Sequence, residues 1–175
     1  MKKILALTLV AVLLAGCGAA TVKTGVGTVI SVAKSADAAA DKDGLAESDV
    51  TMAAVTFDST GKILGIDINV AQVKVNFDAT GKVTTDLTVA PQTKDELKDA
   101  YGMKKSSTIG KEWYEQVNDL EKWMVGKTAD QIKTMKIKAS DTHPGAPDET
   151  DLSSKVTISV TDFQEAVAKA LANAK

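Results

Sequence analysis

The 175-residue chain carries 21 basic and 23 acidic residues, for a formal net charge of −2 at pH 7, with one cysteine and one histidine. This mildly acidic balance gives no support for nucleic-acid binding. All the basic residues are lysines, which excludes bidentate arginine clamps on phosphate or carboxylate groups, so a bound anion must rely on lysine, hydroxyl groups, backbone N–H groups or a helix N-terminus. The length suits one domain with its own hydrophobic core.

The beginning of the chain predicts where the protein resides. Lys2 and Lys3 precede an apolar run that ends in Leu-Ala-Gly-Cys at positions 14–17. The run is too short for a permanent membrane span, so residues 1–16 are predicted to be a signal peptide. The Leu-Ala-Gly-Cys order resembles the bacterial lipobox, which implies a lipid on the thiol of Cys17 and a mature lipoprotein on the extracytoplasmic face of the cell membrane. Because this cysteine is the only one, neither a disulfide nor a cysteine-ligated metal site is expected.

Residues 17–44 are predicted to contain the lipid anchor, a tether and a first strand. Valine and isoleucine recur in this segment, and Gly25 and Gly27 interrupt them. A third glycine at G-x-G-x-x-G spacing would fall on Ile30 and no helix pattern follows, so flexibility near the anchor is a better explanation than nucleotide binding. Residues 35–48 are small, polar and acidic, and leave a loop and a short alanine-rich helix as alternatives.

An internal repeat organises residues 50–89. FDSTGKI at 57–63 and FDATGKV at 77–83 each place Asp, Thr and Gly between alternating apolar runs, a pattern typical of hairpin turns in which glycine adopts positive φ. The runs VTMAAVTF, KILGIDINV, VKVNF and KVTTDLTV predict an antiparallel meander of about four strands, or five with the first. Asp58 and Asp78 are predicted to cap these turns, because the turns lack the dense oxygen spacing of a calcium loop.

Helical patterns follow Pro91. Thr93 with Glu96, and Thr128 with Gln131, have the spacing of capping boxes and predict two short helices, the first ending at Gly102. Between them an apolar stripe predicts a helix over about 111–125, stopped by Gly126; its members are Ile109, Trp113, Val117, Leu120 and Met124. The glycine, lysine and threonine at 126–128 are not a P-loop, because Glu121 holds the position of the upstream glycine.

Three residues after the sheet are candidates for ligand contact. Trp113 and Trp123 could stack on a planar ring, but packing in the core is the more frequent role for such large apolar side chains. His143 lies in a loop over 136–151 without a second histidine or thiol, so neither a metal site nor a catalytic arrangement is indicated, and a ligand contact stays open.

The last segment, 151–171, joins a hydroxyl-rich loop to an amphipathic helix. Asp151, Ser154 and Thr157 have the spacing D-x-x-S-x-x-T, and the apolar stripe of the helix comprises Phe163, Ala166, Val167, Ala170 and Leu171. The alternation of apolar and hydroxyl residues over 156–161 is also typical of a half-buried strand, in which Thr157 would face solvent.

This segment resembles the C-terminal signature D-x-x-S-G-A-T of the FMN-binding domain family, found in flavin subunits of Rnf- and Nqr-type complexes and in flavinylated extracellular lipoproteins. AVTFDSTGKI at 54–63 and VGKTADQI at 125–132 resemble further family segments in the same order. The resemblance implies that Asp151, Ser154 and Thr157 bind cofactor, and that a flavin transferase esterifies FMN through its phosphate to Thr157. Lys155 and Val156 stand where the family has Gly and Ala, and a β-branched residue crowds the approach.

These observations predict an α+β fold, with an antiparallel β-meander followed by helices, the C-terminal helix packed on the sheet, and an FMN-binding-like domain over 45–175. Two functions remain open. The protein could carry FMN, covalently at Thr157 or bound nearby, and pass electrons between a membrane redox carrier and an extracellular acceptor. It could instead be a lipid-anchored binding or structural module of the same fold without flavin. A turnover enzyme is less favoured, because no catalytic set is recognisable.

Overall fold

The computed structural model describes residues 21–139 and 142–175. The predicted signal peptide and the predicted lipidation site Cys17 lie outside the described residues. Within the described part, none of the helices has the length and apolar character needed to span a membrane.

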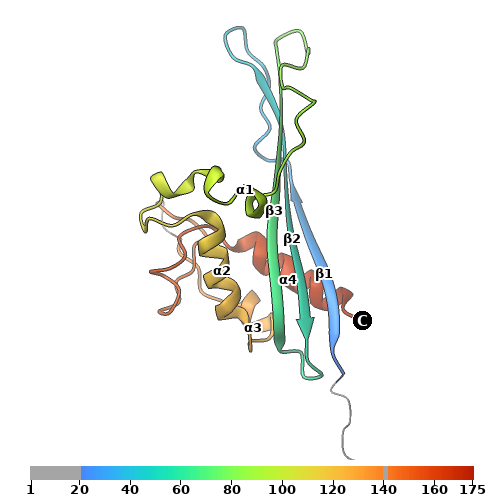
Figure 1. The fold of residues 1–175 in the computed structure, drawn as a ribbon, viewed down its shortest axis with the longest axis vertical. Coiled ribbons are helices and arrows are strands. Elements are labelled where there is room, and N and C mark those ends of the chain that lie inside the picture. The colour runs from blue at the N-terminus through green and yellow to red at the C-terminus, as the bar shows by residue number, and fades with distance from the viewer. Residues whose placement is uncertain (1–20, 140–141) are drawn as a thin grey trace, which may run out of the picture.

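A three-stranded antiparallel sheet in the order β1-β2-β3 runs the length of the molecule (Figure 1). Its strands are β1 (Lys23–Ser31), β2 (Gly44–Phe57) and β3 (Ile63–Phe77). Successive side chains of a strand point to opposite faces, and one face of the sheet supplies core residues, including Val55 and Ile68, while Val26 and Ile30 on the other face are exposed. The architecture is therefore α+β, with all described helices following the sheet in the chain.

The prediction of four or five strands is wrong. KILGIDINV and VKVNF form one strand, β3, because residues 71 and 72 carry no turn signal and continue the pairing with Val50 and Asp49. KVTTDLTV forms no strand, and Val83 makes only an isolated bridge to Phe77 before the chain turns away. Residues 32–43 are a loop and not a helix.

The two FD-x-T-G-K turns have the predicted chemistry. Asp58 Oδ1 accepts hydrogen bonds from the backbone N–H groups of Thr60 and Lys62 at 2.8 and 2.9 Å. Asp78 Oδ1 makes the equivalent bonds in the second turn at 2.8 and 3.0 Å. The glycines that follow have φ of 82° and 85°, so the prediction that these aspartates cap turns is confirmed.

The longer helices are α2 (Trp113–Met124) and α4 (Thr161–Asn173). The shorter ones are α1 (Lys94–Leu97), η1 (Lys98–Tyr101), η2 (Met103–Lys105) and α3 (Ala129–Lys133). Both predicted capping boxes are present, at Thr93 and at Thr128. Helix α2 begins later than predicted and excludes Ile109, because Glu112 and Glu115 form a further capping box at its start.

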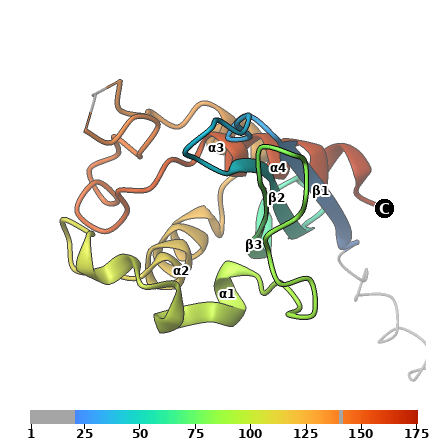
Figure 2. The ribbon, with the colours of Figure 1, turned by 90° about the horizontal axis from the view of Figure 1, so that it is seen from above.

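Helix α4 packs on the sheet, as predicted, and lies against β1 and β2 (Figures 1 and 2). The small residues Gly25 and Gly27 permit this contact, since a Cβ at Gly27 would lie 2.6 Å from the backbone nitrogen of Ala170 and closer still to the carbonyl oxygen of Ala166. The prediction that these glycines provide flexibility near the anchor is wrong: they lie inside β1, where only glycine allows the helix backbone to approach. Most of the predicted stripe of α4 is buried, and Leu171 is exposed.

Polar side chains of the helices engage some of the backbone groups at both outer edges of the sheet. Lys169 and Asn173 of α4 donate to the carbonyl oxygens of Thr28 and Val26 on β1. On β3, Glu121 of α2 accepts a hydrogen bond from the N–H of Ile68 at 2.6 Å. Burial raises the pKa of Glu121 to about 7, although this hydrogen bond favours its ionised form. These contacts occupy backbone groups that could otherwise pair with another strand.

Candidate functional site

The signature segment is a turn followed by an irregular loop that leads into α4. Asp151 and Ser154 are exposed on the turn, whereas Thr157 is half-buried. Residues 156–160 are not a strand, so the alternative of a solvent-facing strand threonine is wrong. Within the part of the chain that the structure describes, no hydrogen bond joins Asp151, Ser154 and Thr157 to one another.

Gln116 of α2 holds the signature loop in place. Its Oε1 accepts hydrogen bonds from the N–H of Thr157 at 2.8 Å and from the Thr157 hydroxyl at 3.3 Å. Gln116 is fully buried, and the adjacent Val156 is also fully buried. The sequence analysis missed Gln116, although a glutamine one position from the apolar stripe of α2 was a usable signal for a buried polar contact.

A pocket of about 240 Å³ lies beside the end of this loop, between the sheet, η1 and the starts of α2 and α4. We call it the aromatic pocket. Its aromatic lining consists of Tyr101, Trp113 and Phe163, and its remaining walls are formed by Lys34, Asp49, Thr51, Val70, Lys94, Met103, Ile158, Ser159 and Asp162.

Its aromatic side chains come from three separate elements. The rings of Trp113 and Phe163 meet edge to face, with their centroids 6.3 Å apart and an interplanar angle of 80°. The ammonium of Lys94 lies 5.0 Å from the ring centroid of Tyr101 and 5.6 Å from that of Trp113, within the range of cation–π attraction. Trp113 is therefore packed in the core and also forms part of the pocket wall.

The sheet contributes a charged group to the same pocket. Asp49 and Thr51 of β2 are pocket residues, and Glu47, two positions before Asp49, lies on the same face of the strand. The ammonium of Lys34 lies 2.6 Å from Asp49 Oδ2 and 3.6 Å from Glu47 Oε1. Its hydrogen bond to Asp49 raises the pKa of Lys34, and partial burial opposes this. Acidic residues in the inward-facing phase of β2 were a sequence signal for this site that the sequence analysis missed.

One oxygen of Asp49 has no partner. Oδ2 is bound to Lys34, but Oδ1 is buried and accepts no hydrogen bond from any residue of 21–139 or 142–175. Buried acceptors are nearly always paired, so an exception points to a bound water, ion or ligand.

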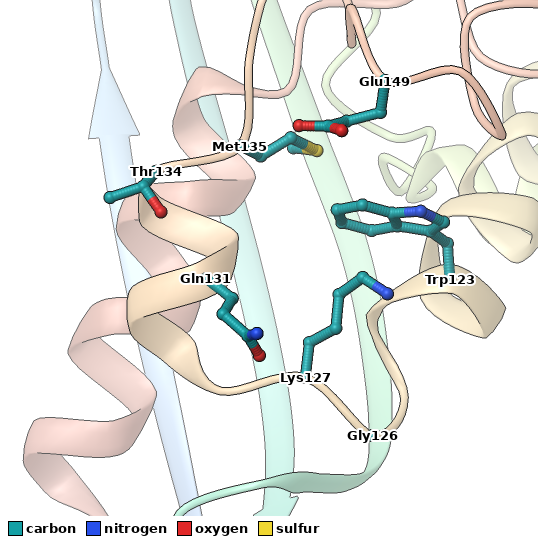
Figure 3. A pocket seen from close by; sticks show the side chains of 7 residues that line it. All are labelled: Trp123, Gly126, Lys127, Gln131, Thr134, Met135 and Glu149. Carbon is teal, nitrogen blue, oxygen red and sulfur yellow. The ribbon is translucent and has the colours of Figure 1, made fainter.

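A second depression, of about 400 Å³, lies at the C-terminal end of α2, next to α3. We call it the Trp123 groove; its lining is Trp123, Gly126, Lys127, Gln131, Thr134, Met135 and Glu149. Figure 3 shows the Trp123 ring between the side chains of Lys127 and Glu149, and the ammonium of Lys127 lies 4.2 Å from the ring centroid. The lining of this groove contains one aromatic side chain, against three in the aromatic pocket, so the groove is the weaker candidate for binding a planar ring.

The other candidates of the sequence analysis lie outside both sites. His143 Nε2 is 3.3 Å from the hydroxyl of Thr108, and His143 lines neither the aromatic pocket nor the Trp123 groove. Among the described residues, no cluster of three or more histidine, cysteine or acidic side chains is arranged to hold a metal ion.

Comparison with known proteins found similarity to a protein that is named as a reductase. Over 146 residues the chain is 31% identical to chlorophenol reductase of Desulfitobacterium hafniense, and the match covers 75% of this chain and 43% of the reductase. The chain therefore spans less than half of that protein's length. No family model matches the chain, and no solved structure matches it.

Proposed function

We propose that this protein is an FMN-binding-domain-like lipoprotein of the bacterial cell envelope that binds FMN and carries electrons. One observation carries the proposal: the signature loop leads directly into the aromatic pocket, where Ile158, Ser159 and Asp162 form one wall. The likeness to a protein named as a reductase agrees with a redox role.

The aromatic pocket fits part of FMN. A cavity of about 240 Å³ is below the size of most small-molecule sites, so it suits the fused ring system and leaves the ribityl phosphate outside. The rings of Tyr101 and Trp113 offer apolar surface, and the buried Oδ1 of Asp49 offers an unused acceptor. Because the chain has no arginine, a lysine of the pocket lining, Lys94, would balance part of the phosphate charge.

The phosphate-acceptor position fits less well. The Thr157 hydroxyl is already hydrogen-bonded to Gln116, and the Val156 beside it is buried. Esterification would require the loop to leave Gln116, so non-covalent binding is favoured over covalent attachment. Bound FMN would supply one- and two-electron redox chemistry; the residues of this chain would bind the ring, orient it and exclude water from one of its faces.

The proposed setting follows from the beginning of the sequence. A lipid on Cys17 would hold the domain at the extracytoplasmic face of the membrane. A membrane redox carrier would then be the electron donor, an extracellular molecule would be the acceptor, and a flavin transferase would act on the protein if attachment is covalent.

A direct test uses the full chain, purified in detergent after expression with and without a flavin transferase. Non-covalent binding predicts flavin absorbance that survives dialysis and disappears on denaturation, with no change in mass. Covalent attachment predicts an FMN mass increment that is lost in Thr157→Ala. If the folded protein shows neither and does not bind added FMN, the flavin function is wrong.

The alternative is a lipid-anchored binding or structural module without flavin. Lys155 and Val156 at the signature, and the hydrogen-bonded state of Thr157, favour it. It becomes the working model if the test above finds no flavin.

A further inference from the structure

The unpaired oxygen of Asp49 can accept a hydrogen bond from a ligand in the aromatic pocket. The Asp49 side chain is 13% exposed, its Oδ2 is held by Lys34, and its buried Oδ1 accepts no hydrogen bond from the described residues. A buried acceptor of this kind is unfavourable unless a donor reaches it. Since Asp49 lines the pocket, a bound molecule can supply that donor.

Lys34 adds a donor next to this acceptor. An ammonium has three N–H groups, and the structure pairs that of Lys34 with two carboxylates, Asp49 and Glu47. Its side chain is 58% exposed, so a third N–H can reach a ligand. Asp49 of β2 and Lys34 of the loop after β1 therefore place an acceptor beside a donor, which is the complement of a ring edge that carries an N–H beside a carbonyl.

The aromatic side chains of the other walls favour a planar ligand. Trp113 and Phe163 line the pocket with their rings at 80° to each other, and Tyr101, beside Lys94, is the third aromatic residue of the lining. Aromatic walls of this kind bind planar rings by stacking and edge contacts, and a pocket of about 240 Å³ has room for little beyond the ring system.

We propose that Asp49 and Lys34 determine ligand specificity by binding the imide edge of a planar heteroaromatic ring, with Asp49 Oδ1 accepting from the ring N–H and Lys34 donating to an adjacent carbonyl. This inference rests on the proposed flavin function, and it assigns the edge of the ring that faces the sheet. In FMN the edge is N3–H with its two flanking carbonyl groups. The dimethylbenzene end of the ring system then lies farthest from Asp49, and the ribityl phosphate leaves from the central ring.

The test compares FMN with its N3-methyl derivative, which keeps the ring and phosphate but lacks the imide proton. Binding to the full chain in detergent is measured by quenching of flavin fluorescence. We expect the N3-methyl derivative to bind at least about tenfold more weakly than FMN, because its methyl group leaves Asp49 Oδ1 unpaired and crowds it.

Asp49→Asn identifies the residue responsible. Its amide oxygen would face Lys34 and its NH₂ group would face the ligand, so FMN should lose affinity and the difference between the two flavins should fall to about twofold or less. Asp130→Asn is the control, since Asp130 is an exposed carboxylate of α3 that lines neither the aromatic pocket nor the Trp123 groove, and it should keep the full difference.

The outcomes separate the inference from the function on which it rests. Equal binding of the two flavins by the unaltered protein overturns the imide assignment and leaves flavin binding intact, whether or not Asp49→Asn folds. A full difference between the two flavins that persists in folded Asp49→Asn also overturns it. Failure of the folded protein to bind either flavin overturns the proposed function and the inference together.

Discussion

Gly27→Ala tests whether α4 can form its observed contact with the sheet only through glycine. The added Cβ would lie 2.6 Å from the backbone nitrogen of Ala170 and closer still to the carbonyl oxygen of Ala166, against 3.4 Å for the onset of ordinary contact. The helix would therefore have to withdraw by at least 0.8 Å, since 3.4 Å minus 2.6 Å is 0.8 Å. Both opposing groups are backbone atoms, so no side chain can rotate to relieve the overlap.

The withdrawal separates a buried helix face from the sheet. Phe163, Ala166 and Val167 of α4 are all buried, and a gap of this size forfeits a quarter to a half of their dispersion attraction to the sheet. Overpacking of a core typically costs about 1–3 kcal/mol, and we expect the upper end, about 3 kcal/mol, because the strain lies between two backbones. Since Phe163 also lines the aromatic pocket, FMN binding should weaken in the same variant.

The assay is urea unfolding followed by circular dichroism, which gives the free energy of unfolding. Gly65→Ala is the matched control, because Gly65 lies in β3 and a Cβ there would meet no atom within 4 Å. We expect the control to stay within about 1 kcal/mol of the unaltered protein. A Gly27→Ala variant as stable as the control would refute the explanation of the glycines as a helix-packing site.

Two further variants test polar groups of α2. Glu121 has a pKa raised by burial from 4.5 to about 7, so its contribution to stability is full below about pH 4.5 and is lost as the pH rises through about 7. Glu121→Gln lacks this titration. The free energy of unfolding of the variant, relative to that of the unaltered protein, should therefore rise between pH 5 and pH 8 by on the order of 1 kcal/mol, after discounting for partial exposure. Thermal melts that show a constant difference between the two proteins across that range would contradict this. Gln116→Leu removes the acceptor of Thr157, and we expect unfolding measurements to show a loss of about 2 kcal/mol. If a transferase acts on Thr157, intact mass should show more flavin on this variant than on the unaltered chain, and an equal or smaller amount would mean that Gln116 does not restrict access.

Parts of the candidate site were within reach of the sequence. The signature segment was correctly predicted to lead from a loop into a helix, and Trp113 was identified as a candidate for ligand contact. For Thr157 the sequence left two alternatives, a flavin-bearing signature residue and a solvent-facing strand residue. Neither included the hydrogen bond to Gln116, which lies 41 positions away in the chain. Asp49 and Lys34 were not identified, because polar residues on a strand do not reveal whether the face they occupy will be covered.

The sequence by itself determined the features that depend on neighbours a few residues apart. The aspartate turns and the capping boxes at Thr93 and Thr128 formed as predicted, because each is closed by hydrogen bonds between residues two to four positions apart. The tertiary structure alone decided the strand count, the reason for Gly25 and Gly27, and the unpaired oxygen of Asp49. These depend on which distant segments pack together, and that is set by the burial of whole faces of the sheet and helices and not by any local pattern.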